Sequence, residues 1–164
     1  MRSIFWIGLG LLLGVFDYTF AQYFMVFGLM PSLLFMTIVL VALLENIKTT
    51  LFVGFILGLT ADAMTASLFG VKTIAFLAIA VVIISLRRNA RSYSIVLLVV
   101  ATVIATIIVA ISTFVFANYY GINVRYSDYL LHWYLPFVLF NALAMPVFAV
   151  VVRKIHTCFV KYFD

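Results

Sequence analysis

One apolar segment does most to constrain the fold, because Ile95 to Ala117 contains no charged residue at all. Roughly 20 apolar residues are enough for a helix to cross the hydrocarbon core of a bilayer. Similar apolar segments fill most of the remaining chain, which is 68% hydrophobic and only 9% charged. Soluble domains are closer to about half apolar and about a quarter charged. The sequence therefore predicts an integral membrane protein with a single membrane domain, residues 1–164.

The chain length predicts how many helices this domain contains. At about 20 residues per crossing, there is room for about six transmembrane helices and almost no soluble domain. We therefore expect an all-α, polytopic six-helix bundle. Whether residues 18–30 are helical, re-entrant or interfacial stays open. The predicted spans are approximately 4–20, 31–44, 51–69, 71–86, 95–117 and 133–152. Residues 153–164 are predicted to extend the last helix as a basic amphipathic cytoplasmic tail.

Basic residues are distributed unequally between the two predicted sides of the membrane. If the N-terminus is cytoplasmic, the outer side holds only Lys72 and Arg125. The positive-inside rule then predicts that both termini are cytoplasmic. Basic residues at helix ends meet anionic lipid, so the net charge of +5 does not indicate a nucleic-acid partner. For the tail, lipid contact is favoured over docking of a cytoplasmic partner. The predicted cytoplasmic basic cluster comprises Arg87, Arg88, Arg91, Arg153 and Lys154.

Three residues of the third predicted span share one helical face, because Gly54, Gly58 and Asp62 are spaced four positions apart. We call this face the glycine–aspartate stripe. Glycines on such a face let a neighbouring helix approach closely, and a carboxylate at membrane depth is costly unless it faces protein, water or the interface. Together with Gly70 in the tight connection that follows, the stripe is predicted to form a helix-packing or partner interface. The neighbouring helix could belong to this chain, to a partner or to a second copy.

Two prolines predict features of the helices that contain them. Pro31 suits the first turn of the second span, where its missing N–H costs nothing. If that helix begins earlier, a bend is expected at Pro31. Pro146 falls inside the last span and is expected to bend it.

The sequence does not contain the set of residues that an enzyme would need. It has no glycine-rich phosphate loop, HExxH, nucleophile elbow or CxxC motif. His132 and His156 fall on opposite predicted sides, and Cys158 is alone, so we predict no catalytic residue, metal site or cofactor. The acidic residues are spread between both faces: Asp17, Glu45, Asp62, Asp128 and Asp164.

Transport of an ion or a small molecule is the alternative that the residues leave open. Acids inside a membrane often mark proton or ion routes, and Asp62 with Asp17 is a conceivable pair. Asp17 also suits a helix-end carboxylate at the interface, and no inverted repeat is visible. Tyrosines between Asn118 and His132 suit an aromatic belt or, less readily, a partner site. A helix-packing scaffold is therefore favoured over transport.

Several of these motifs together resemble the rod shape-determining protein MreD family. The glycine–aspartate stripe carries most of the resemblance, with Gly54-Phe55 leading through Gly58 to Asp62. The number of predicted spans and the chain length agree, so the resemblance covers nearly the whole chain. The other matching residues are Pro31-Ser32-Leu33-Leu34, Leu68-Phe69-Gly70-Val71-Lys72, Asn141, Pro146, Arg153 and Lys154.

This resemblance implies a non-enzymatic subunit of the cell-elongation machinery, or elongasome, in a bacterial inner membrane. Its implied partner is MreC, within an assembly that includes MreB, RodA and a class B penicillin-binding protein during peptidoglycan synthesis. Association of the chain with copies of itself is a further alternative. The family is similar in fold to the substrate-binding subunits of energy-coupling-factor transporters. The rival function is therefore a vitamin-binding subunit, whose pocket would open outward and be lined by the aromatics between Asn118 and His132.

Overall fold

The computed structural model describes residues 2–19, 32–65, 70–89, 95–121 and 134–163. Within these ranges the chain is helical and forms no strand, which confirms the predicted all-α fold. The described helices are α1 (Arg2–Thr19), α2 (Leu33–Leu44), α3 (Ile47–Thr65), α4 (Val71–Asn89), α5 (Ile95–Tyr119) and α7 (Leu135–Phe163).

The length and composition of the apolar helices support the prediction of an integral membrane protein. Three described segments have the length and composition to cross a bilayer: Ile47–Met64, Ile95–Tyr119 and Leu135–Phe159. Shorter apolar helices lie at Ser3–Thr19 and Leu33–Leu44. The 12 residues of α2 rise only about 18 Å, whereas the hydrocarbon core is about 30 Å thick. The number of six crossings therefore stays a prediction.

The centre of the fold is α2, which is buried on every side. Every residue from Leu34 to Leu43 is buried, and a helix that is apolar all round belongs in an interior. The other helices α1, α3, α4, α5 and α7 all contact it. Ser32 begins the helix, because its side chain accepts a hydrogen bond from the N–H of Phe35 at 3.4 Å.

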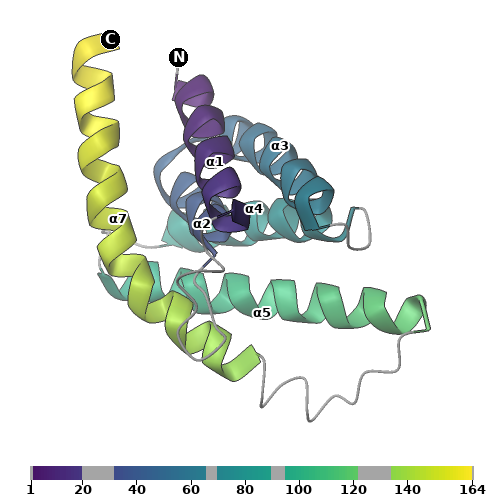
Figure 1. The fold of residues 1–164 in the computed structure, drawn as a ribbon. Helices are drawn as coiled ribbons and strands as arrows, with labels where there is room; N and C mark the ends of the chain where they lie inside the picture. The colour runs from purple at the N-terminus through teal and green to yellow at the C-terminus, as the bar shows by residue number, and fades with distance from the viewer. Residues whose placement is uncertain (1, 20–31, 66–69, 90–94, 122–133, 164) are drawn as a thin grey trace.

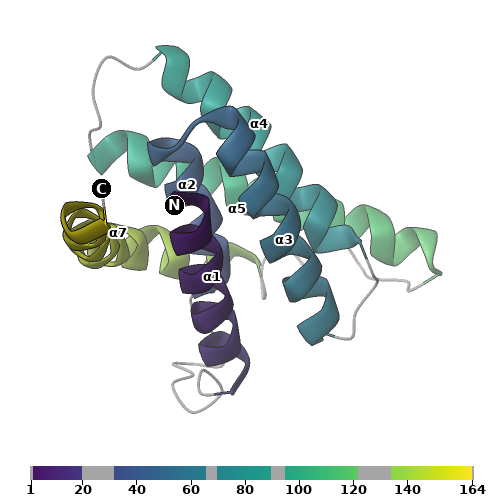
Figure 2. The same ribbon diagram turned by 90° about the horizontal axis from the view of Figure 1, so that it is seen from above.

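The surrounding helices are arranged unevenly about this centre. Figure 1 shows α1, α2 and α3 gathered on one side of α5, and α4 contacts both α3 and α5. Seen from above in Figure 2, α1 to α4 lie close together, whereas the C-terminal part of α7 stands at the edge of the molecule. Helix α7 packs on α5, which in turn packs on α4. Its last turns return to the beginning of α1, where the rings of Phe5 and Phe159 lie 4.7 Å apart.

The last helix continues into the predicted tail, because α7 runs without interruption from Leu135 to Phe163. It contains Pro146 and bends along its length (Figure 1). The other predicted proline feature, at Pro31, lies outside the described residues.

Candidate functional site

Asp62 lies near the end of α3 and is only 1% exposed. Its carboxylate accepts hydrogen bonds from the backbone N–H groups of Gly70 and Lys72, at 2.9 Å each, and of Thr73 at 3.0 Å. The hydroxyl of Thr73 donates another at 2.7 Å. The first N–H groups of a helix lack partners inside the helix, and the helix dipole favours negative charge there. Asp62 therefore caps the start of α4, and these donors offset the cost of burying its charge.

Gly70 shapes the connection that makes this cap possible. Its φ is +95°, a left-handed conformation in which other residues are strained. A Cβ atom at Gly70 would meet nothing within 4 Å, so conformation rather than crowding calls for glycine here. The start of α4, directly after Gly70, lies beside Asp62.

Gly58 determines how closely α3 and α4 approach. A Cβ atom at Gly58 would lie 2.5 Å from the Cα atom and 3.1 Å from the N atom of Thr73. Carbon atoms in ordinary contact are about 3.5–4.0 Å apart, so no side chain fits. One turn earlier, a Cβ atom at Gly54 would lie 3.1 Å from the Cδ1 atom of Ile38 and 3.6 Å from the carbonyl oxygen of Phe76. The glycine–aspartate stripe therefore lies between α2 and α4 of the same chain.

The two kinds of residue in the stripe act on one residue of α4. Gly58 leaves the space in which the backbone of Thr73 sits, and Asp62 binds both the N–H and the hydroxyl of Thr73. The glycine thus supplies proximity and the aspartate supplies hydrogen bonds. Because α4 fills this notch, a helix from a partner has no access to it in this fold.

Asp17 repeats the same device at the start of α2. Its Oδ2 atom accepts the N–H of Leu34 at 3.0 Å and the hydroxyl of Ser32 at 3.4 Å. The N–H of Ser32 donates to Oδ1 of the buried Asn141 at 3.3 Å, which ties α7 to the same helix start. We call this end of the bundle, with the caps of α2 and α4, the capped end.

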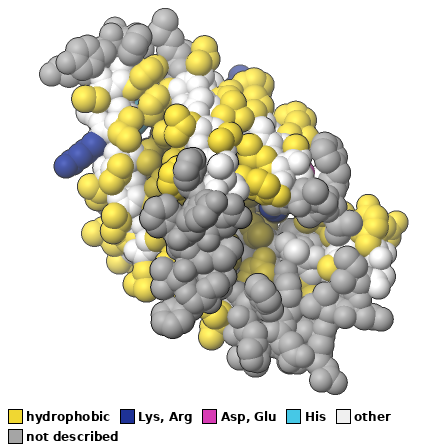
Figure 3. Space-filling view, in the orientation of Figure 1, with side chains coloured by type: hydrophobic (Ala, Val, Ile, Leu, Met, Phe, Trp, Pro, Cys, Tyr) yellow, Lys and Arg dark blue, Asp and Glu magenta, His cyan; other side chains and the backbone are white. Residues whose placement is uncertain are grey.

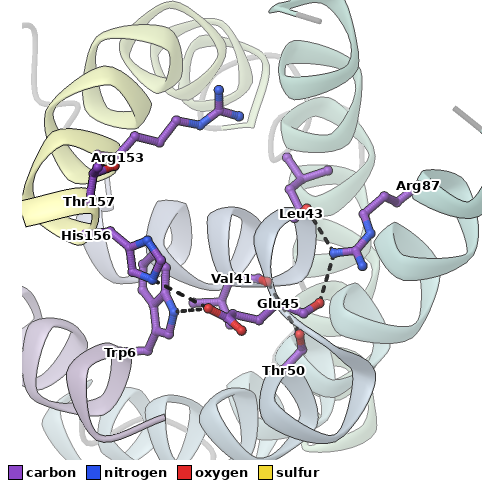
Figure 4. Close-up of polar contacts among 9 residues, drawn as sticks. All are labelled: Trp6, Val41, Leu43, Glu45, Thr50, Arg87, Arg153, His156 and Thr157. Atoms are coloured by element: carbon purple, nitrogen blue, oxygen red, sulfur yellow. Dashed lines mark hydrogen bonds and ion pairs between the residues drawn. The ribbon is translucent and has the colours of Figure 1, made fainter. Parts of the chain in front are cut away.

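The opposite end is held by a cluster around Glu45, which ends α2 and is 6% exposed. Its Oε1 atom accepts the indole N–H of Trp6 at 3.0 Å and lies 3.6 Å from Nε2 of His156 (Figure 4). The rings of Trp6 and His156 stack 5.1 Å apart. Residues from α1, α2 and α7 therefore meet at this cluster, which we call the Glu45 cluster.

Arg87 completes this end from α4. Its Nη1 atom donates to the carbonyl oxygens of Leu43 at 3.0 Å and Glu45 at 2.9 Å (Figure 4). The last carbonyls of a helix lack partners inside the helix, and a cation beside them is favoured by the helix dipole. Arg87 therefore caps the C-terminus of α2 as Asp17 caps its N-terminus.

The predicted basic cluster is only partly described. Arg87 is half-buried against α2, whereas Lys154 is exposed on α7 and Arg153 is half-buried there. The side chain of Arg88 and the whole of Arg91 lie outside the described residues. Contact of this cluster with anionic lipid stays a prediction.

Sequence reasoning missed the Glu45 cluster. In the sequence Glu45 is one of several scattered acidic residues, and its partner Trp6 lies 39 positions away. No local spacing connects residues so far apart. The signal that the sequence does hold is a single carboxylate directly after an apolar helix, which would be costly to bury without donors from elsewhere.

The described residues offer little else for chemistry. No group of three or more His, Cys, Asp and Glu side chains in the described ranges could hold a metal ion. Of the loop aromatics, Tyr119 and Tyr120 are exposed at the end of α5 with rings 5.5 Å apart, and residues 122–133 lie outside the described ranges. At the capped end, the carboxylates of Asp17 and Asp62 hold the starts of α2 and α4 in position.

A family model described as rod shape-determining protein MreD matches residues 1–158. No curated protein and no solved structure shows a significant match. The similarity in fold to the substrate-binding subunits of energy-coupling-factor transporters therefore stays a prediction.

Proposed function

Because the chain belongs to the rod shape-determining protein MreD family, we propose that it is a non-enzymatic scaffold subunit of the bacterial cell-elongation complex. In this proposal it lies in the cytoplasmic membrane with both termini inside. There it binds MreC and helps direct peptidoglycan synthesis by an assembly that includes MreB, RodA and a class B penicillin-binding protein.

The main observation in support of this proposal is that the carboxylate of Asp62 is bonded to the start of α4. An acid that relays protons or ions must exchange partners during transport. Asp62 instead uses both oxygens to hold the start of α4, through bonds of 2.7–3.0 Å from three residues of the same chain. This arrangement supports a structural role for Asp62, the acidic residue that had most suggested transport.

The proposal locates partner contacts away from the glycine–aspartate stripe, since α4 occupies it. Surfaces that a membrane partner can reach are exposed and apolar, and Figure 3 shows hydrophobic side chains spread over the visible face. The outer face of α7 is one such surface, exposing Leu135, Leu139, Leu143, Val147 and Val150. In the proposal the stripe supports partner binding indirectly, by keeping α3 and α4 in register.

Purification of the tagged chain from native membranes, followed by identification of the proteins that accompany it, tests the proposal. We expect MreC and other cell-elongation proteins. An ATPase coupling module in their place would support the vitamin-transport function and contradict the scaffold. The variant Gly58→Ala should recover less MreC at equal expression. Gly8→Ala is the matched control, because Gly8 is exposed on α1 and a Cβ atom there would meet nothing within 4 Å.

A further inference from the structure

A cavity of about 280 Å³ opens at the capped end of the bundle. Two charged residues contribute to its wall: Asp17 from the end of α1 and Lys72 from the first turn of α4. The remaining wall is largely apolar and includes Phe35, Phe76 and Phe137. A largely apolar cavity with a few convergent polar groups is the usual form of a small-molecule site.

Asp17, which lines this cavity, has one carboxylate oxygen with an unused capacity to accept a hydrogen bond. Oδ2 of Asp17 is occupied by the cap of α2, but Oδ1 is buried and has no hydrogen-bond partner in the part of the chain that the structure describes. A buried carboxylate oxygen is unfavourable until it meets a donor. A ligand that supplies an N–H group here would therefore gain a charge-assisted hydrogen bond.

Lys72 offers the opposite charge across the same cavity. Its backbone N–H is taken by Asp62, and its side chain is half-buried. Among the described residues, its ammonium group forms no hydrogen bond or ion pair. The ammonium group is attracted by the carboxylates of both Asp62 and Asp17. Asp62 is bonded to the start of α4 and is not among the residues that line the cavity, so Asp17 and Lys72 are the charges that a ligand in the cavity meets. One is negative and one is positive, which matches a ligand that carries one positive and one negative group.

We propose that this cavity binds the headgroup of a phospholipid that has both a primary ammonium and a phosphate. The ammonium donates to Oδ1 of Asp17, and the phosphate pairs with Lys72. At about 280 Å³ the cavity is just below the roughly 300–1,000 Å³ of typical small-molecule sites, so it admits a headgroup and not a whole lipid. The acyl chains then extend into the bilayer from the apolar wall. This site is independent of the proposed scaffold function.

Native mass spectrometry of the full chain in detergent tests this proposal with lipids of matched short acyl chains. Phosphatidylethanolamine should bind at least about tenfold more tightly than phosphatidylcholine, which has no N–H donor, and phosphatidylglycerol, which has no ammonium. It should also bind more tightly than water-soluble phosphoethanolamine, which has the same charged groups without the chains. Equal binding of the three lipids would overturn the proposal, and equal binding of phosphoethanolamine would overturn a lipid as the source of the headgroup.

Two variants assign the charged contacts. Asp17→Asn retains an oxygen for the cap of α2 but presents an amide N–H₂ to the cavity, and Lys72→Met keeps the length of the side chain without its charge. Each should weaken phosphatidylethanolamine binding by about tenfold or more. Lys48→Met is the matched control, since Lys48 is exposed in the first turn of α3. Unchanged affinity in both cavity variants would overturn the proposal.

A third variant separates the cavity from the charges. Val109 of α5 lines the cavity, and Val109→Phe should fill it while leaving Asp17 and Lys72 in place. We expect phosphatidylethanolamine binding to fall about tenfold or more in this variant. If Asp17→Asn fails to fold, this variant and the lipid comparison on the unaltered chain still decide the matter. Full binding by Val109→Phe would place the lipid elsewhere and overturn the proposal.

Discussion

Replacing Gly58 by alanine adds a single methyl group at the closest approach of α3 and α4. That Cβ atom would lie 2.5 Å from the Cα atom of Thr73, where carbon atoms need about 3.5 Å. The neighbouring atom belongs to the backbone, so α4 as a whole must move by about 1 Å. A shift of this size along the bonds from Thr73 to Asp62, now 2.7 and 3.0 Å, would take both past the limit of about 3.5 Å for a hydrogen bond.

The expected cost follows from these two effects. Overpacking a close-packed contact costs about 1–3 kcal/mol, and a hydrogen bond to a charged group contributes about 1.5–3 kcal/mol. Alanine also favours the helix by up to about 1 kcal/mol relative to glycine. We therefore expect Gly58→Ala to lower the free energy of unfolding by about 2–4 kcal/mol.

Reversible unfolding of the purified chain in mixed micelles, followed by far-UV circular dichroism as the fraction of SDS rises, measures this change. Gly8→Ala isolates helix propensity, because Gly8 is exposed and its added methyl meets nothing within 4 Å. This control should be as stable as the unaltered chain or slightly more stable. If Gly58→Ala proved as stable as Gly8→Ala, the close contact between α3 and Thr73 would be wrong.

Three further substitutions test the caps by the same unfolding measurement. Asp62→Leu should destabilise the chain by about 3–5 kcal/mol, and Asp62→Asn by less, since it keeps one acceptor oxygen; equal effects would refute the cap. Trp6→Phe removes the indole donor to the buried Glu45 and should cost about 1–3 kcal/mol, whereas a neutral result would separate α1 from the Glu45 cluster. Arg87→Met should cost about 1–2 kcal/mol through the lost carbonyl contacts, and Lys154→Met, exposed on α7, should cost almost nothing.

Much of the helical framework could be predicted because hydropathy and turn residues carry it. The predicted span 95–117 corresponds to α5 (Ile95–Tyr119), and the span 71–86 to α4 (Val71–Asn89). The continuation of the last helix into the tail was predicted, but its contacts were not, because α7 packs His156 and Phe159 against α1. A basic amphipathic pattern is equally compatible with lipid and with protein on its apolar side.

The central position of α2 was not predicted either. An unbroken apolar run is expected both for a helix that faces lipid and for one buried among other helices, so composition cannot separate the two. The burial of every residue from Leu34 to Leu43 decides between them.

The candidate site was likewise predicted only in part. The spacing of Gly54, Gly58 and Asp62 was visible in the sequence because helical periodicity is local. The donors to Asp62 lie eight to eleven positions further on, at Gly70 and in the first turn of α4, where helical periodicity along α3 no longer applies. The Glu45 cluster unites residues from the beginning, middle and end of the chain, so only the tertiary fold brings them together.

The measurement that tests the scaffold most directly is binding of purified MreC to the purified chain in lipid nanodiscs, with no nucleotide or small metabolite added. We expect a stable complex for the unaltered chain and for Gly8→Ala, and a weaker one for Gly58→Ala. A folded, unaltered chain that bound no MreC, or that bound it only when a metabolite was supplied, would contradict the account.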